Sequence, residues 1–109
     1  MTKNNFKVIW SPQASIDLEE IILYIAERNP INVGAIFNQL KSKADGLSKF
    51  PYKGVVVPEL KTFGITSYLQ LIAKPWRIIY RIQEETVFVV TVIDSRQNVQ
   101  EVLLAKIAR

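Results

Sequence analysis

Three strand-like segments follow one another directly in the second half of the chain, and this succession constrains the fold more than any other feature. They occupy residues 67–73, 76–82 and 86–93, with Lys74-Pro75 and residues 83–85 as the turns between them. Connections this short join antiparallel neighbours, because a parallel pair needs a long crossover. The third segment is apolar at nearly every position, which indicates a central strand with both faces covered. The chain is therefore predicted to contain an antiparallel meander.

The middle segment, WRIIYRI at 76–82, has chemically different faces because successive side chains of a strand point to opposite sides. Its apolar face is made of Trp76, Ile78, Tyr80 and Ile82. This face is predicted to pack in the core, whereas Arg77 and Arg81 share the other face, roughly 13–14 Å apart along the strand. Guanidinium groups donate paired hydrogen bonds and stay charged, so the arginines could bind neighbouring phosphates. Alternatively, they pair with nearby Glu side chains or cover the sheet with their stems.

Two amphipathic helices precede these strands. The first has Ser11 as its N-cap and Pro12 at its first helical position, and it ends at Asn29-Pro30. Its early turns carry the acidic residues that are predicted to complement the helix dipole: Asp17, Glu19 and Glu20. The second helix extends to Phe50-Pro51. The tight connection between the two helices predicts an antiparallel helical hairpin.

Together these elements predict an α+β fold for residues 1–109, which form a single domain. An N-terminal strand at 6–10 comes first, the antiparallel helical hairpin packs on one face of an antiparallel sheet, and a short C-terminal helix at 98–109 comes last. The segment from 51 to 64 is irregular, with a short strand-like run at 55–57. The face of the sheet opposite the hairpin is then the expected place for a ligand.

Composition excludes several kinds of chemistry. The chain has no Cys and no His, so it lacks a thiolate nucleophile, an imidazole acid or base and the usual zinc ligands. No apolar run is long enough to span a bilayer and none has the form of a secretory signal, so we expect a cytoplasmic protein. Residues 51–109 carry eight basic and five acidic groups, which suits a polyanion or an acidic protein partner. A solvated surface that keeps the protein soluble is the plainer interpretation.

Glu59 is the carboxylate with the best placement for acid–base chemistry. It lies in VVVPEL, in the loop that leads to the sheet, from which it could approach Arg77. A carboxylate beside a guanidinium could accept a proton from a hydroxyl while the arginine stabilises charge on phosphorus. Lys74 and Arg96 flank the strands and could extend the basic patch. A salt-bridged or solvated loop residue is the alternative interpretation of Glu59.

Four stretches of the chain together resemble the RelE/ParE superfamily of toxins from bacterial type II toxin–antitoxin pairs. They are VIWSPQASIDLEEIILYIAERNP, VPEL, KPWRIIYRI and VFVVTVIDSRQNVQEVL, in that order. The similarity extends over essentially the whole chain. It implies a small α+β toxin that a cognate antitoxin neutralises, with no metal or other cofactor.

Members of this superfamily act on different targets. Those similar to RelE and YoeB cut mRNA in the ribosomal A site through attack of the ribose 2′-hydroxyl on the adjacent phosphate, whereas ParE-like members inhibit DNA gyrase. By position, Arg77 matches the arginine at the scissile phosphate and Glu59 matches the general base of YoeB-like members. Arg96 matches the first arginine of a frequent H-x-R-R ending, and it would assist the leaving oxygen. Lys74 and Arg81 would bind further phosphates.

The chain also departs from the ribonuclease pattern. Asp94 stands where the ending commonly has His, Gln97 replaces its second Arg, and Tyr68-Leu69-Gln70 replaces a frequent Tyr-Arg-Glu. One cation and the usual general acid are missing, which favours gyrase as the target, while the Glu59–Arg77 pair favours mRNA cleavage. We expect a toxin that cuts mRNA on the ribosome, with gyrase inhibition as the alternative. An inactive toxin and an α+β binding module without either activity are the remaining interpretations.

Overall fold

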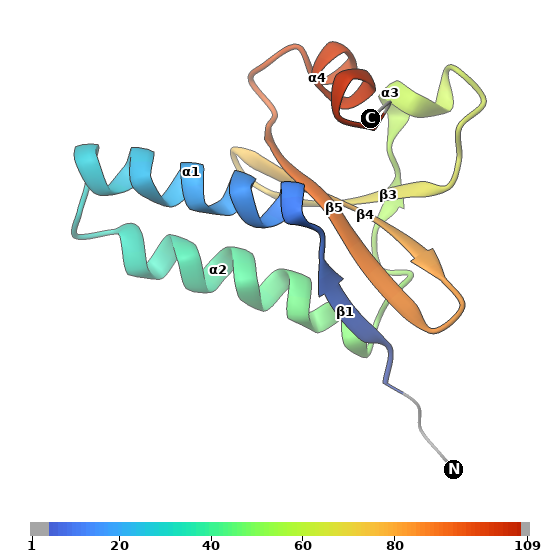
Figure 1. The fold of residues 1–109 in the computed structure, drawn as a ribbon, viewed down its shortest axis with the longest axis horizontal. Helices are drawn as coiled ribbons and strands as arrows, with labels where there is room; N and C mark the ends of the chain where they lie inside the picture. The colour runs from blue at the N-terminus through green and yellow to red at the C-terminus, as the bar shows by residue number, and fades with distance from the viewer. Residues whose placement is uncertain (1–4, 108–109) are drawn as a thin grey trace.

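The computed structural model describes residues 5–107, which form a five-stranded sheet with helices on both faces (Figure 1). The strands lie in the order β1-β5-β4-β3-β2. In chain order the elements are β1 (Lys7–Trp10), α1 (Pro12–Arg28), α2 (Val33–Asp45), the 3₁₀ turn η1 (Gly46–Ser48), β2 (Val55–Val56), α3 (Pro58–Lys61), β3 (Tyr68–Ala73), β4 (Trp76–Gln83), β5 (Thr86–Asp94) and α4 (Val99–Ile107).

The predicted meander is confirmed, but the sheet as a whole is mixed. β3 pairs antiparallel with β4, and β4 pairs antiparallel with β5. β1 instead runs parallel to β5, with Lys7 opposite Thr86 and Trp10 opposite Val89, so the prediction of a wholly antiparallel sheet is wrong at this edge. The connection permits this direction, because the chain passes through the helical hairpin and three further strands before β5, which is more than enough for a parallel crossover.

The helical hairpin has the predicted start and order. The Ser11 side chain caps α1 by accepting a hydrogen bond from the Ala14 N–H at 3.0 Å, and Pro12 occupies the first turn. α1 ends at Arg28, directly before the predicted stop, whereas α2 ends at Asp45 and gives way to η1 earlier than predicted. In Figure 1, α1 and α2 lie side by side and cover one face of the sheet.

The main core lies between this hairpin and the sheet. Trp76, Ile78 and Tyr80 of β4 are buried in it, as the period of the strand predicts. The other members of this core that are fully buried or nearly so are Ala14, Leu18, Ile25, Leu40, Ala44, Leu47, Leu71, Ala73, Val87, Val89 and Val92.

A second, smaller core covers part of the opposite face, which was the expected place for a ligand. α3 and α4 pack there, at the top of Figure 1, and they meet Ile79 and Ile93 of the sheet. The apolar side chains at the centre of this second core are Val57, Leu60, Ile79, Ile93, Val99 and Leu103. Tyr68 of β3 also packs against it.

Among residues 5–107, no helix has the length and apolar character needed to cross a membrane.

Candidate functional site

Glu59 and Arg77 meet at the margin of the second core, as the sequence predicts. Pro58 begins the single turn of α3, and Leu60 is fully buried, so α3 is held against the sheet with Glu59 directed toward β4. Nη1 of Arg77 donates to Oε1 of Glu59 at 2.8 Å and to Oε1 of Gln70 at 3.1 Å. The side chains of Arg77 and Glu59 are 15% and 25% exposed. The catalytic roles assigned to this pair from the sequence remain predictions.

The environment of Glu59 favours its charged form. Burial acts to raise the pKa of the carboxyl, but the hydrogen bond and charge of Arg77, together with a backbone hydrogen bond, outweigh burial and hold the pKa below its usual value of 4.5. The Glu59 carboxylate is therefore ionised at neutral pH and already accepts a hydrogen bond from Arg77. To act as a base it would have to exchange this partner for a substrate hydroxyl.

We expect the Glu59–Arg77 pair to make folding stability depend on pH. Because the folded-state pKa of Glu59 is lowered, its contribution is complete above the unfolded value near 4.5 and is lost as pH falls through the folded value. Urea unfolding at pH values from about 7 to 3 should therefore show a smaller acid-induced loss in Glu59→Gln than in the wild type. Glu27→Gln, which removes a carboxylate whose side chain is 79% exposed, is the matched control. Identical pH slopes for the wild type and Glu59→Gln would contradict the expectation.

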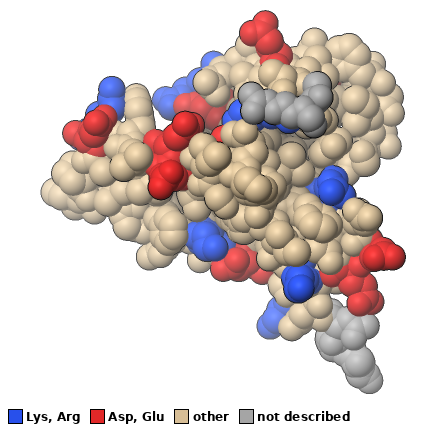
Figure 2. Space-filling view, in the orientation of Figure 1, with Lys and Arg blue, Asp and Glu red and all other residues tan. Residues whose placement is uncertain are grey.

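The other predicted phosphate-binding residues do not converge on Arg77. Arg81 lies on the same face of β4, but its guanidinium donates to Gln83 at 3.0 Å and stacks over the Phe88 ring at 4.6 Å. Lys74 is exposed in the turn between β3 and β4. On the face of the molecule in Figure 2, basic and acidic groups are interspersed, so the charge excess of the second half forms no continuous basic field there.

Arg96 lies on the hairpin side of the sheet, away from Glu59 and Arg77. It binds Asp94 through two side-chain hydrogen bonds, of 2.9 Å from Nε and 2.6 Å from Nη2. These bonds lower the pKa of the Asp94 carboxyl, against a smaller opposing effect of burial. Asp94 is paired across the strands with Trp76, whereas Arg77 is paired with Ile93, so the two ion pairs belong to opposite faces.

The Asp94–Arg96 pair borders a cavity of about 390 Å³ between α1, the end of β5 and α4. Glu20 and Tyr24 of α1 line it, as does Lys106 of α4. The cavity holds acidic and basic groups together, and neither Glu59 nor Arg77 is part of its wall. The three residues predicted for catalysis are therefore divided between two places.

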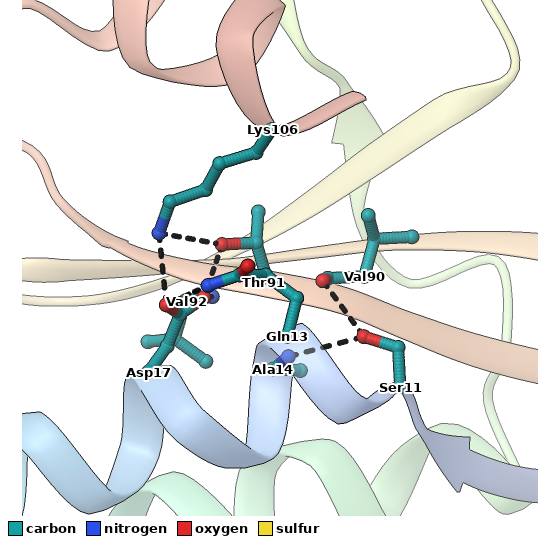
Figure 3. Close-up of polar contacts among 8 residues, drawn as sticks. All are labelled: Ser11, Gln13, Ala14, Asp17, Val90, Thr91, Val92 and Lys106. Atoms are coloured by element: carbon teal, nitrogen blue, oxygen red, sulfur yellow. Dashed lines mark hydrogen bonds and ion pairs between the residues drawn. The ribbon is translucent and has the colours of Figure 1, made fainter. Parts of the chain in front are cut away.

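Asp17 forms a polar site that the sequence prediction missed, shown in Figure 3. Its side chain is only 3% exposed, and Nζ of Lys106 lies 2.8 Å from its Oδ1. Gln13 also donates to Oδ1 at 2.8 Å, while the Thr91 hydroxyl and the Val92 N–H donate to Oδ2. We call Asp17, Thr91 and Lys106 the Asp17 cluster. The prediction from the sequence assigned Asp17 only to the helix dipole and did not include the burial of its carboxylate or its pairing with Lys106.

The course of β5 explains why a carboxylate belongs at this position. β1 ends opposite Val89, so the next residues of β5 have no strand beside them on that edge. The side chains of α1 satisfy the exposed backbone instead: Ser11 donates to the Val90 carbonyl at 2.9 Å, and Asp17 accepts from the Val92 N–H at 3.1 Å. A sequence signal existed, because Asp17 lies three residues after Ala14 and so falls on the buried stripe of α1.

Solved structures of two toxin–antitoxin systems have a fold similar to that of this chain. The chain resembles the chromosomal ParDE toxin–antitoxin system of P. aeruginosa, with a TM-score of 0.69 at 13% identity over 84% of this chain and 98% of that chain. It also resembles the RelBE2 toxin–antitoxin complex of Mycobacterium tuberculosis, with a TM-score of 0.56 at 20% identity over 85% and 94% of the two chains. The fold is that of the RelE/ParE class of toxins.

Sequence similarity identifies the family within that class. The family model of the ParE toxin of the type II toxin–antitoxin system parDE matches residues 8–99. Toxin ParE3 of Caulobacter vibrioides is 31% identical over 97 residues, which cover 84% of this chain and 89% of that protein. The chain therefore belongs to the ParE toxin family of type II toxin–antitoxin systems. The RelE/ParE resemblance predicted from the sequence is confirmed.

Within residues 5–107, no group of three or more His, Cys, Asp or Glu side chains is arranged to hold a metal ion.

Proposed function

We propose that this ParE-family toxin stops growth by inhibiting DNA gyrase, without cutting nucleic acid, and that a cognate antitoxin binds and neutralises it. The observation that carries the proposal is the separation of Arg96 from the Glu59–Arg77 pair. Cleavage of RNA needs a base and charge-stabilising groups arranged around one phosphate. Here the sheet divides those groups, and Asp94 occupies the guanidinium of Arg96. Membership of the ParE family supports the same target.

Ribosome-dependent mRNA cleavage is the second candidate, and the Glu59–Arg77 contact is the observation that favours it. A carboxylate and a guanidinium 2.8 Å apart are the minimal pair for taking a proton from a 2′-hydroxyl and stabilising charge on phosphorus. Positioning of the mRNA by the ribosome could supply much of the rate. Both candidates share the toxin fold and differ in whether this pair is needed for toxicity.

Toxicity without the Glu59–Arg77 pair is therefore the expected result. We expect induction of the toxin alone to halt growth and to cause double-strand DNA breaks, while mRNA 5′ ends stay unchanged. The double variant Glu59→Gln/Arg77→Gln, which keeps a hydrogen-bonding pair without its charges, should remain toxic. Purified toxin should inhibit supercoiling by gyrase, and a co-expressed antitoxin should relieve the growth arrest.

The controls separate loss of function from loss of folding. Soluble yield and urea unfolding of the double variant show whether it is folded, and the exposed-site variant Glu27→Gln reports the effect of induction alone. New mRNA 5′ ends in translated frames that disappear in a folded double variant would contradict gyrase as the target and support mRNA cleavage. Normal growth at high soluble expression of the wild type would contradict both candidates.

A further inference from the structure

The segment KFPYK at residues 49–53 exposes two aromatic rings between two lysines. Phe50 is 66% exposed and Tyr52 is 70% exposed, although most rings of this size are largely buried in a folded protein. Neither the Glu59–Arg77 pair nor the Asp17 cluster includes any residue of this segment. We propose that this segment and Lys43 of α2 form a binding surface for an unpaired nucleic acid strand.

Two adjoining hollows give this surface its shape. One, of about 600 Å³, is lined by residues 49–53. The other, of about 240 Å³, shares Phe50 and Lys53 with the first and adds Lys43 from the end of α2. The three lysines Lys43, Lys49 and Lys53 are exposed, and among residues 5–107 none of them forms an ion pair. They are therefore free to contact an anion.

The segment is held on a rigid support. The buried hydroxyl of Tyr80 donates to the Pro51 carbonyl at 2.8 Å and accepts from the Gly54 N–H at 2.9 Å. Gly54 packs so closely that a Cβ there would lie 2.5 Å from the Gln70 carbonyl oxygen. The Tyr52 ring has an edge-to-face contact with Phe6, with the ring centres 6.4 Å apart. The backbone of the segment and the Tyr52 ring are thus positioned in advance of binding, which reduces the entropy lost on association.

An unpaired strand fits both features of this surface at once. Lysines around the hollows can neutralise successive phosphates, and an exposed aromatic ring can stack on any base because every base has a π-face. Bases of a duplex are already stacked and offer no such face. The Asp and Glu side chains of an acidic peptide would use the lysines but have no aromatic face to stack on the rings. DNA and RNA strands share the required chemistry, so the experiment includes one probe of each and compares their affinities.

The test is direct binding of labelled oligonucleotides to the purified full-length chain by fluorescence anisotropy. The probes are thymidine and uridine oligomers of about 12 nucleotides and a duplex of the same length, which lies within the usual site size for single strands. We expect both single strands to bind more tightly than the duplex. Raising salt from about 50 to 200 mM should weaken binding with a log–log slope of about 2, because three lysines each contribute about 0.7.

Variants assign the binding to this surface. Phe50→Ser/Tyr52→Ser should weaken single-strand binding by at least about 5-fold, the loss expected from one stacked base, with the salt slope unchanged, because stacking is lost and the charges remain. Lys43→Gln/Lys49→Gln/Lys53→Gln should reduce the salt slope to near zero. Arg28→Gln is the matched control, because it removes a positive charge at the opposite end of the helical hairpin (Figure 1). Urea unfolding of each variant confirms that the fold is kept.

Three outcomes would overturn the proposal: no binding of either single strand at low salt, equal binding of duplex and single strands, or binding that survives both sets of substitutions. An oligomer of glutamate of equal charge that displaces the bound strand as effectively as an unlabelled single strand does would also count against it, since the rings would then add nothing to binding. The assay contains no gyrase and no ribosome. Its failure is therefore distinguishable from failure of the proposed function, which the growth and supercoiling experiments test.

Discussion

Replacing Asp17 with Ala is expected to lower the free energy of unfolding by about 3–5 kcal/mol, because it leaves a partly buried ammonium without its counter-ion. The side chain of Lys106 is 23% exposed and has Asp17 and Thr91 as its hydrogen-bond partners. The same substitution takes the acceptor away from the Val92 N–H, which is also buried. Urea unfolding at neutral pH measures the loss directly. The expected effect is a large fraction of the stability of a domain of this size.

The matched control for this prediction is Glu20→Ala, since Glu20 is an exposed acidic residue one turn further along α1. It should change the free energy of unfolding by no more than about 0.5 kcal/mol. Lys106→Met removes the charge and keeps most of the stem, so Asp17→Ala/Lys106→Met should recover part of the loss seen in Asp17→Ala. A loss of less than about 1 kcal/mol in Asp17→Ala, or no recovery in the double variant, would show that the ion pair is not a structural contact.

The elements built on local sequence periodicity were predictable. The alternation in WRIIYRI placed Trp76, Ile78 and Tyr80 in the core, and Ser11-Pro12 marked the start of α1. The direction of β1 was not predictable in this way. β3 and β5 both run antiparallel to β4, so a first strand can meet either edge of the meander in parallel or antiparallel orientation, and no local pattern encodes which one forms. The pattern of apolar residues in α4 likewise does not indicate which face of the sheet this helix covers.

The candidate site was predictable in part: the contact between Glu59 and Arg77 was foreseen, but the position of Arg96 was not. Glu59 and Arg77 do meet, because Pro58 and Leu60 fix the turn of α3 over β4. Arg96 was grouped with them because it follows the last strand of the meander and matches the first arginine of the H-x-R-R ending in the family resemblance. The alternation of the strands works against that grouping: Asp94, which holds Arg96, is paired with Trp76 and so belongs to the hairpin side. Neighbouring residues at the end of a strand point to opposite faces of the sheet, so a position close to β5 in sequence does not place Arg96 beside Arg77.

Leu103→Ala is expected to lower the free energy of unfolding by about 2–5 kcal/mol. Leu103 is fully buried in the second core, where α4 packs against α3 and the sheet, and its removal leaves a cavity between these elements. Leu23→Ala is the matched control, because Leu23 is 61% exposed on α1 and should cost little. Urea unfolding gives the magnitude, and hydrogen exchange should report faster exchange of the α4 amides. Equal losses in Leu103→Ala and Leu23→Ala would contradict the second core.

The two large effects act on the same element, so they are not expected to add. α4 is held to the molecule by Leu103 on one side and by Lys106, through Asp17, on the other. Once the first substitution has separated α4 from the sheet, the second one removes a contact that is already partly lost. Neighbouring sites couple in this way by about 0.5–3 kcal/mol. Asp17→Ala/Leu103→Ala should therefore cost less than the sum of its parts. Full additivity would mean that α4 stays in place when either contact is lost, and that each contact stabilises the fold independently.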